Sequence, residues 1–140
     1  MDYCITYFST AAESTTDQDI LDIVEFSRKK NARLNITGVL LYINGSIVQV
    51  LEGQQLAVED VYKSIKADPR HTNVRTAINQ PIARRLFSHW YMGYETLTTQ
   101  QYEEVSTIIS MDPQAESTPD AKDSVILRML KGFFDMNRRQ

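Results

Sequence analysis

The residue whose type and position most suggest chemistry is Gln49, in the middle of the apolar run 47–51. Such a run is typical of a strand buried on both faces. A buried carboxamide without hydrogen-bond partners costs about 1–3 kcal/mol, so another polar group must meet it. That group is either a neighbouring protein atom or a ligand in a pocket between a sheet and its helices, and spacing alone leaves both open.

Four further side chains could converge on the same place. Tyr7 lies on a predicted strand, and Asn31 continues the inward stripe of a predicted helix. Trp90 and Met92 alternate along a predicted last strand and so should face the same side. Ordinary explanations also exist: core packing for the tyrosine, tryptophan and methionine, and a helix C-terminal turn for the asparagine. Together with Gln49, these groups suit a flat heteroaromatic ligand that carries carbonyls and ring nitrogens.

Other kinds of site find little support in the sequence. No ionisable group is positioned as a base, which disfavours hydrolysis. Cys4, His71 and His89 form no cluster with metal-ligand spacing, and the five scattered glycines make no phosphate-binding loop. Residues 9–16 contain no arginine, which disfavours an acylphosphatase-like anion site. Arg70 and His71 follow a predicted helix, and a position in a solvated loop would be enough to explain these two polar residues.

Composition narrows the class of protein. The 140 residues are 42% hydrophobic and 24% charged, as expected for one globular domain with a real core. A net charge of −3 disfavours a nucleic-acid or anionic-membrane surface. We expect no signal peptide and no membrane span, because no apolar run approaches the roughly 18–20 residues required. The single cysteine suits a reducing compartment, so a cytoplasmic location is expected.

The predicted elements should bring the candidate residues into one groove. Strands are predicted at residues 2–9, 36–43, 46–52, 73–80 and 85–94, and helices at about 17–33, capped by Thr16 or Asp17, and 56–67. Asn44-Gly45 predicts a type I′ hairpin turn. The order predicts an α+β, ferredoxin-like βαββαββ fold, a mixed five-stranded sheet with two helices on one face. A right-handed crossover would make the first and third strands parallel.

The core is expected to end near residue 97. A polar helix at roughly 99–110, a linker (111–124) and a last helix should follow. The last helix carries an apolar stripe, which must cover either the bare face of the sheet or another subunit. The residues of this stripe are Ile126, Met129, Leu130, Phe133 and Phe134.

Over roughly residues 3–95 the chain resembles the BLUF family of flavin-binding blue-light sensors. The resemblance rests on six segments in order and with family-like spacing, namely residues 5–9, 27–31, 35–41, 49–53, 68–71 and 85–92. It divides the chain into a flavin-binding photosensor domain, residues 1–97, and a C-terminal helical extension, residues 98–140. The extension would cap the sheet or contact an oligomer or partner.

The resemblance also implies a role for each candidate residue. Tyr7 would give an electron and a proton to the excited flavin, and Gln49 would rearrange its hydrogen bonds between the tyrosine and the flavin. Trp90 and Met92 would read out the state of Gln49. The other residues implied to bind the cofactor are Ser27, Lys30, Asn31, Ile65, Asp68, Arg70 and His71, while Tyr7 and Gln49 contact it as well.

The implied function is a blue-light photoreceptor without catalytic turnover, which holds FAD, with FMN as the alternative. Residues 98–140 are too few for a cyclase or phosphodiesterase domain, so we expect a stand-alone sensor. It would form a homo-oligomer and pass a reversible, red-shifted signalling state to a separate protein, without membrane or direct nucleic-acid contact. The alternatives are a ferredoxin-like small-ligand enzyme and a cofactor-free interaction module.

Overall fold

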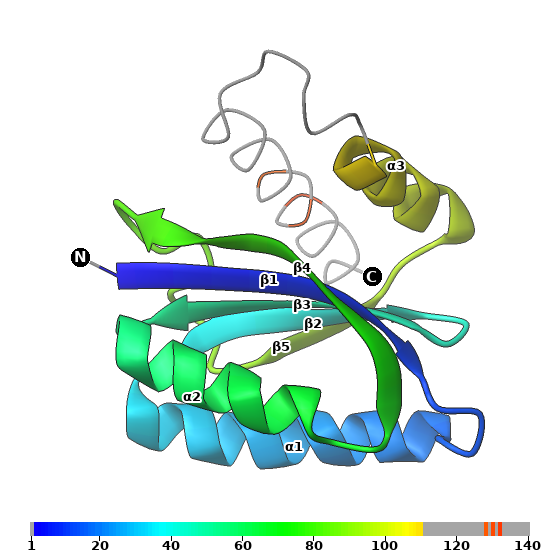
Figure 1. The fold of residues 1–140 in the computed structure, drawn as a ribbon, viewed down its shortest axis with the longest axis horizontal. Helices are drawn as coiled ribbons and strands as arrows, with labels where there is room; N and C mark the ends of the chain where they lie inside the picture. Colours follow the sequence, from blue (N-terminus) through cyan, green and yellow to red (C-terminus); the bar gives the residue numbers. More distant parts are fainter. Residues whose placement is uncertain (1, 111–127, 129, 131, 133–140) are drawn as a thin grey trace.

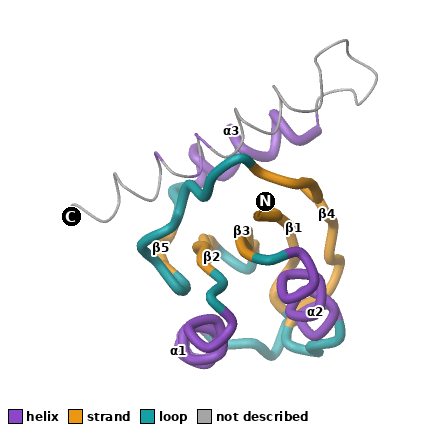
Figure 2. The backbone as a smooth tube through the Cα atoms, turned by 90° about the vertical axis from the view of Figure 1, so that its left-hand side faces the viewer, coloured by secondary structure: helices purple, strands orange, loops and turns teal. Residues whose placement is uncertain are grey.

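The computed structural model describes residues 2–110 and, farther along the chain, residues 128, 130 and 132. The described elements are β1 (Asp2–Ala11), α1 (Asp17–Leu34), β2 (Thr37–Ile43), β3 (Ser46–Gly53), α2 (Gln55–Lys66), β4 (His71–Ile82), β5 (Gly93–Thr96) and α3 (Thr99–Ser110). Helices α1 and α2 lie on one face of the sheet, and α3 lies on the other (Figure 1, Figure 2). Within the described residues, no helix has both the length and the apolar character that a membrane span requires.

The sheet has five strands in the order β4-β1-β3-β2-β5. Among the described strands, only β2 and β5 pair in parallel, and the other neighbours are antiparallel. The predicted parallel pairing of the first and third strands is therefore wrong. The Asn44-Gly45 turn, with φ angles of 43° and 89°, folds β3 back between β1 and β2. The crossover through α1 makes β1 parallel to β2 instead, with β3 inserted between them.

The predicted last strand, residues 85–94, is also wrong in its extent. Strand β5 covers only Gly93–Thr96, while β4 runs on to Ile82 through Pro81. A proline is tolerated there because β4 is an edge strand. Strands β4 and β5 occupy opposite edges of the sheet, so residues 83–92 must cross the sheet as a loop.

Alternating side chains of the central strands form two cores. One core lies between the sheet and helices α1 and α2, and contains Ile5, Leu51 and Val58. The other core covers the opposite face, where Leu130 is fully buried. Leu130 is the described member of the predicted C-terminal stripe, and it covers the sheet. Ile126, Met129, Phe133 and Phe134, like the predicted linker, lie outside the described residues.

The N-terminus of α1 carries a capping box. The Thr16 hydroxyl accepts a hydrogen bond from the Asp19 backbone N–H at 3.1 Å, and the Asp19 carboxylate accepts one from the Thr16 N–H at 2.9 Å. We expect Thr16→Ala to lower the free energy of unfolding by about 1 kcal/mol, because an N–H at the helix start loses its acceptor. Urea denaturation followed by circular dichroism measures this. Thr16→Ser keeps the hydroxyl, so an equal loss in that variant would contradict the capping explanation.

Candidate functional site

A cleft lies between α1 and α2, with Gln49 of β3 among its lining residues. It consists of two adjoining depressions, and the one that Lys30 and Asn31 line is the larger. The residues that line both depressions are Ile23, Ser27, Gln49, Ile65, Asp68 and Arg70. The cleft thus combines apolar side chains from two helices with a carboxamide from the sheet and a charged pair from the loop after α2.

Tyr7, Gln49 and Met92 form a hydrogen-bonded chain at this cleft. Tyr7 and Gln49 are directly paired on antiparallel strands, so both side chains project from the same face of the sheet. The Tyr7 hydroxyl donates to Gln49 Oε1, and Gln49 Nε2 donates to Met92 Sδ at 3.4 Å. All three side chains are buried. Gln49 therefore has hydrogen-bond partners within the protein and also lines a pocket. A protein partner for the buried amide does not exclude a ligand site beside it.

The surroundings of Tyr7 keep its phenol protonated. Its ring centroid lies 5.4 Å from that of Tyr62 and 6.0 Å from that of His71. Burial raises the pKa of Tyr7 far above the ordinary value for tyrosine, and the nearby Tyr62 and Asp68 raise it further. The hydroxyl therefore carries its proton at neutral pH and is available as a hydrogen-bond donor to Gln49.

Asn31 reaches across from the last turns of α1. Its side chain is buried, lines the larger depression, and donates from Nδ2 to the Tyr91 carbonyl at 2.8 Å. Asn31 thus connects the cleft to the loop that carries Met92. The burial of Asn31 confirms its predicted inward position. Its hydrogen bond to the Tyr91 carbonyl could not be predicted from helical spacing.

Trp90 and Met92 do not share a face, which corrects the prediction for these residues. Met92 packs in the core beside Gln49, whereas Trp90 is half-buried against the core on the opposite side of the sheet. Both residues precede β5, so the alternation of a strand does not apply to them. In this arrangement Met92, and not Trp90, contacts Gln49.

Charged and polar groups line the end of the cleft near the loop after α2. Arg70 pairs with Asp68 at 2.7 Å and holds the pKa of the Asp68 carboxyl below its usual range. His71 Nε2 donates to the Ile65 carbonyl at 2.5 Å, since a carbonyl can only accept, and Nδ1 lies 2.9 Å from Ser9 Oγ. These bonds fix the imidazole ring beside Tyr7. Lys30 of α1 lines the larger depression.

All nine residues that the resemblance assigned to cofactor binding line one or both depressions. They are Tyr7, Ser27, Lys30, Asn31, Gln49, Ile65, Asp68, Arg70 and His71. The residues fit a flavin: apolar side chains for its ring system, carboxamides for its polar edge, and the cations Lys30 and Arg70 for phosphate. Among the described residues, no group of three or more His, Cys, Asp or Glu could hold a metal ion.

Sequence reasoning gave no role to several residues that shape this site. The Tyr62 ring contacts Tyr7, and Ser9 Oγ contacts His71. Arg28 and Glu52 form hydrogen bonds with the loop of residues 83–92. Tyr62 was visible only as part of an apolar helical stripe. The contacts of Glu52 join positions more than thirty residues apart, which no local pattern reveals.

Comparison with known proteins decides the family. The family model described as "Sensors of blue-light using FAD" (BLUF) matches residues 3–93. The chain belongs to the BLUF family. Among curated proteins, this BLUF chain is similar to the photoactivated adenylate cyclase subunit beta of Euglena longa, with 39% identity over 104 residues. That match covers 74% of this chain but only 12% of the relative's length.

Solved structures agree with this assignment. The BLUF protein BlrB in its dark state has a TM-score of 0.72 and 29% identity, with 94% of this chain and 96% of that chain covered. A bacterial light-regulated adenylyl cyclase has a TM-score of 0.66 and 29% identity, with 94% of this chain and 36% of that chain covered. The BLUF assignment confirms the predicted fold class and the predicted blue-light sensory function. The roles of individual site residues stay predictions.

Proposed function

We propose that this BLUF domain responds to blue light by rearranging the hydrogen bonds of Gln49 between Tyr7 and a bound flavin. The observation that carries the proposal is the hydrogen-bonded chain of Tyr7, Gln49 and Met92 beside a cleft between two helices. The flavin, when bound, would supply blue-light absorption and an acceptor for an electron and a proton. The protein supplies the position of the phenol and of the carboxamide.

Tyr7 is the proposed donor of that electron and proton. Its buried phenol is neutral, because burial raises its pKa, and its hydroxyl is already directed at Gln49 Oε1. Loss of the phenolic proton would remove the donor that holds the carboxamide in its present orientation. The hydrogen bond from Tyr7 thus couples the state of the phenol to the state of Gln49.

The chemistry of a carboxamide explains how Gln49 would switch. A half-turn about its terminal bond exchanges the acceptor Oε1 with the donor Nε2. Oε1 would then face Met92 Sδ, which has no proton to donate, so the contact with Met92 would be lost together with the present bond from Tyr7. One or two hydrogen bonds are worth about 1–3 kcal/mol, enough to bias a two-state equilibrium.

The cofactor that we propose is FAD, with FMN as the alternative. The family description names FAD, and Phe26, Lys30 and Ser64 line the larger depression. Lys30 and Arg70 are the proposed partners of phosphate groups, because cations attract phosphate oxygens.

We further propose that the chain itself turns over no substrate and acts in the cytoplasm as a homo-oligomer. Its output would pass from Gln49 and Met92 to a separate effector protein. The light-regulated cyclases that match it carry a corresponding region within a much longer chain, which supports a sensory role for this region.

Absorption spectroscopy tests the proposal directly. The full chain is loaded with FAD, freed of excess cofactor, and measured before and after blue light and again after darkness. We expect a yellow protein whose flavin bands shift to longer wavelength and return in the dark, whereas free FAD shows no reversible shift. A yellow protein without the shift would overturn the proposed photochemistry. A colourless protein would favour the cofactor-free interaction module.

A further inference from the structure

The loop of residues 83–92, here called the β4–β5 loop, has no regular structure of its own but carries both Trp90 and Met92. It joins strands at opposite edges of the sheet. Met92 reaches the cleft side of the sheet and contacts Gln49, whereas Trp90 packs on the far side. The position of Met92 beside Gln49 therefore depends on whatever holds this loop.

Glu52 holds the beginning of the loop. Its two carboxylate oxygens each accept one backbone hydrogen bond at 2.8 Å, from the N–H groups of Leu86 and Phe87. Among the described residues, Glu52 is the one charged side chain that is fully buried. Burial raises the pKa of its carboxyl, while the two backbone donors and Arg85 oppose that shift. A carboxylate offers a separate acceptor oxygen to each of the two N–H groups, whereas an amide of the same shape offers one oxygen and one N–H₂ group.

Residues of α1 and β2 hold the end of the loop. The carbonyls of three consecutive residues each accept a hydrogen bond at 2.8 Å: Trp90 from the Gly38 N–H, Tyr91 from Asn31 Nδ2 and Met92 from Arg28 Nε. The Arg28 side chain is also oriented by Glu25, at 2.8 Å, and is about half exposed. These bonds fix the backbone of Met92, and therefore the reach of its sulfur toward Gln49.

Strand β3 carries both Gln49 and Glu52, and so it contacts both ends of the β4–β5 loop. Gln49 and Glu52 are three residues apart, so their side chains project from opposite faces of the strand. Gln49 contacts the last residue of the β4–β5 loop on one face, and Glu52 binds its fourth and fifth residues on the other. A change at Gln49 can move Met92 only against the resistance of the anchored loop.

We propose that Glu52 and Arg28 are positioning residues of the light response, which hold the β4–β5 loop so that Met92 lies against Gln49. This proposal rests on the proposed photochemical function of Gln49. Neither residue lines the cleft, so neither is expected to contact the flavin. Their anchors oppose displacement of the loop, and they therefore set the barrier between the dark and signalling states.

The test measures the dark recovery of the full, FAD-loaded chain after blue light. In Glu52→Gln, an N–H₂ group replaces one of the two carboxylate oxygens, so one of the two backbone N–H groups faces a donor in place of its acceptor. We expect flavin binding and the red shift to persist and dark recovery to become about tenfold faster. Arg28→Gln, which removes the contact with the Met92 carbonyl, should act in the same direction.

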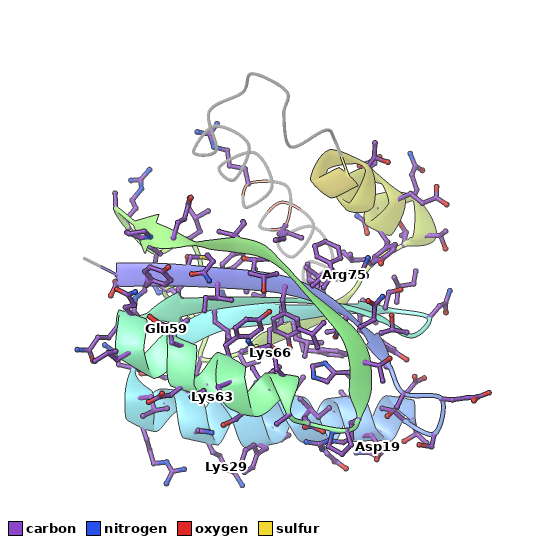
Figure 3. All side chains as sticks on the ribbon, in the orientation of Figure 1. Asp19, Lys29, Glu59, Lys63, Lys66 and Arg75 are labelled. Atoms are coloured by element: carbon purple, nitrogen blue, oxygen red, sulfur yellow. The ribbon has the colours of Figure 1, made fainter. Side chains whose placement is uncertain are left out.

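Two matched controls remove the same charges from exposed positions. Glu59→Gln lies on α2, where Glu59 is exposed (Figure 3), and Arg33→Gln lies in the last turn of α1. Both should recover within twofold of the wild-type rate. If Glu52→Gln does not fold, the surface variant Arg28→Gln still decides the question.

A second readout separates positioning from stability alone. Trp90 is the single tryptophan of the chain and lies in the β4–β5 loop, so quenching of its fluorescence by acrylamide reports on this loop. Illumination should change the quenching constant in the wild type, and this change should be altered in both variants. A lower melting temperature with unchanged recovery and unchanged Trp90 quenching would overturn the proposal. A wild-type protein without any red shift would instead overturn the proposed function itself.

Discussion

Gln49→Leu is expected to abolish the reversible red shift while FAD stays bound. Leucine has a similar volume but cannot accept the hydrogen bond from Tyr7 or donate to Met92 Sδ. The many other residues that line the cleft are unchanged, so binding should persist. The Tyr7 hydroxyl loses its acceptor, and we expect a loss of about 1–3 kcal/mol in stability. Difference spectra before and after illumination measure the effect, which should fall below detection.

A pair of tyrosine variants provides the matched control for this result. Tyr7→Phe keeps the ring but removes the hydroxyl that donates to Gln49, so it should also lack the normal shift. Tyr62→Phe removes a hydroxyl whose partner is Thr76 Oγ1 at 2.5 Å, close to the same ring but not bonded to Gln49. It should retain the shift. A normal photocycle in Gln49→Leu or in Tyr7→Phe would contradict the roles assigned here.

Gly38→Ala is expected to cause the largest loss of stability, about 3 kcal/mol or more. A Cβ atom at Gly38 would lie 1.8 Å from the Val50 carbonyl oxygen, which is backbone of the neighbouring strand and cannot move aside alone. Strands β2 and β3 would have to separate, and the bond from the Gly38 N–H to Trp90 would be disturbed as well. Urea denaturation monitored by circular dichroism provides the measurement.

Gly45→Ala is the control for this prediction. Gly45 has a φ of 89°, but no atom beyond its own residue and its two chain neighbours lies within 4 Å of the place that a Cβ would occupy. The substitution should therefore cost only about 1–2 kcal/mol, from the left-handed backbone conformation. Equal losses in the two variants would show that contact with Val50 is not the reason for glycine at position 38.

The sequence predicted the fold well where local patterns decide the structure. Thr16 at the start of α1, the apolar stripes of the helices and Asn44-Gly45 of the hairpin are local signals, and the structure confirms them. The pairing of β1 with β3 depends on which strand enters the middle of the sheet. That choice is made by packing between distant segments, so the predicted parallel pairing was wrong.

The candidate site was predictable in its residue types but not in its contacts. The apolar run around Gln49 marked a buried amide, but only the register of β1 and β3 identifies Tyr7 as its partner. For Trp90 and Met92, strand alternation was the wrong rule. The Glu52 carboxylate accepts hydrogen bonds from the loop, and the Gly38 N–H donates one to it. Both residues are distant from the loop in sequence. They hold this segment as a loop, in which Trp90 and Met92 pack on opposite faces of the sheet.

The position of β5 at the edge of the sheet bears on which part of the domain can move when Gln49 changes its hydrogen bonds. Strand β3, which carries Gln49, is hydrogen-bonded to β1 on one side and to β2 on the other, so its backbone is held in place. β5 is four residues long, has β2 as its one neighbour, and continues almost at once into α3. We therefore expect a disturbance that begins at the buried amide to displace this short edge strand more readily than β3, and α3 is the next element along the chain.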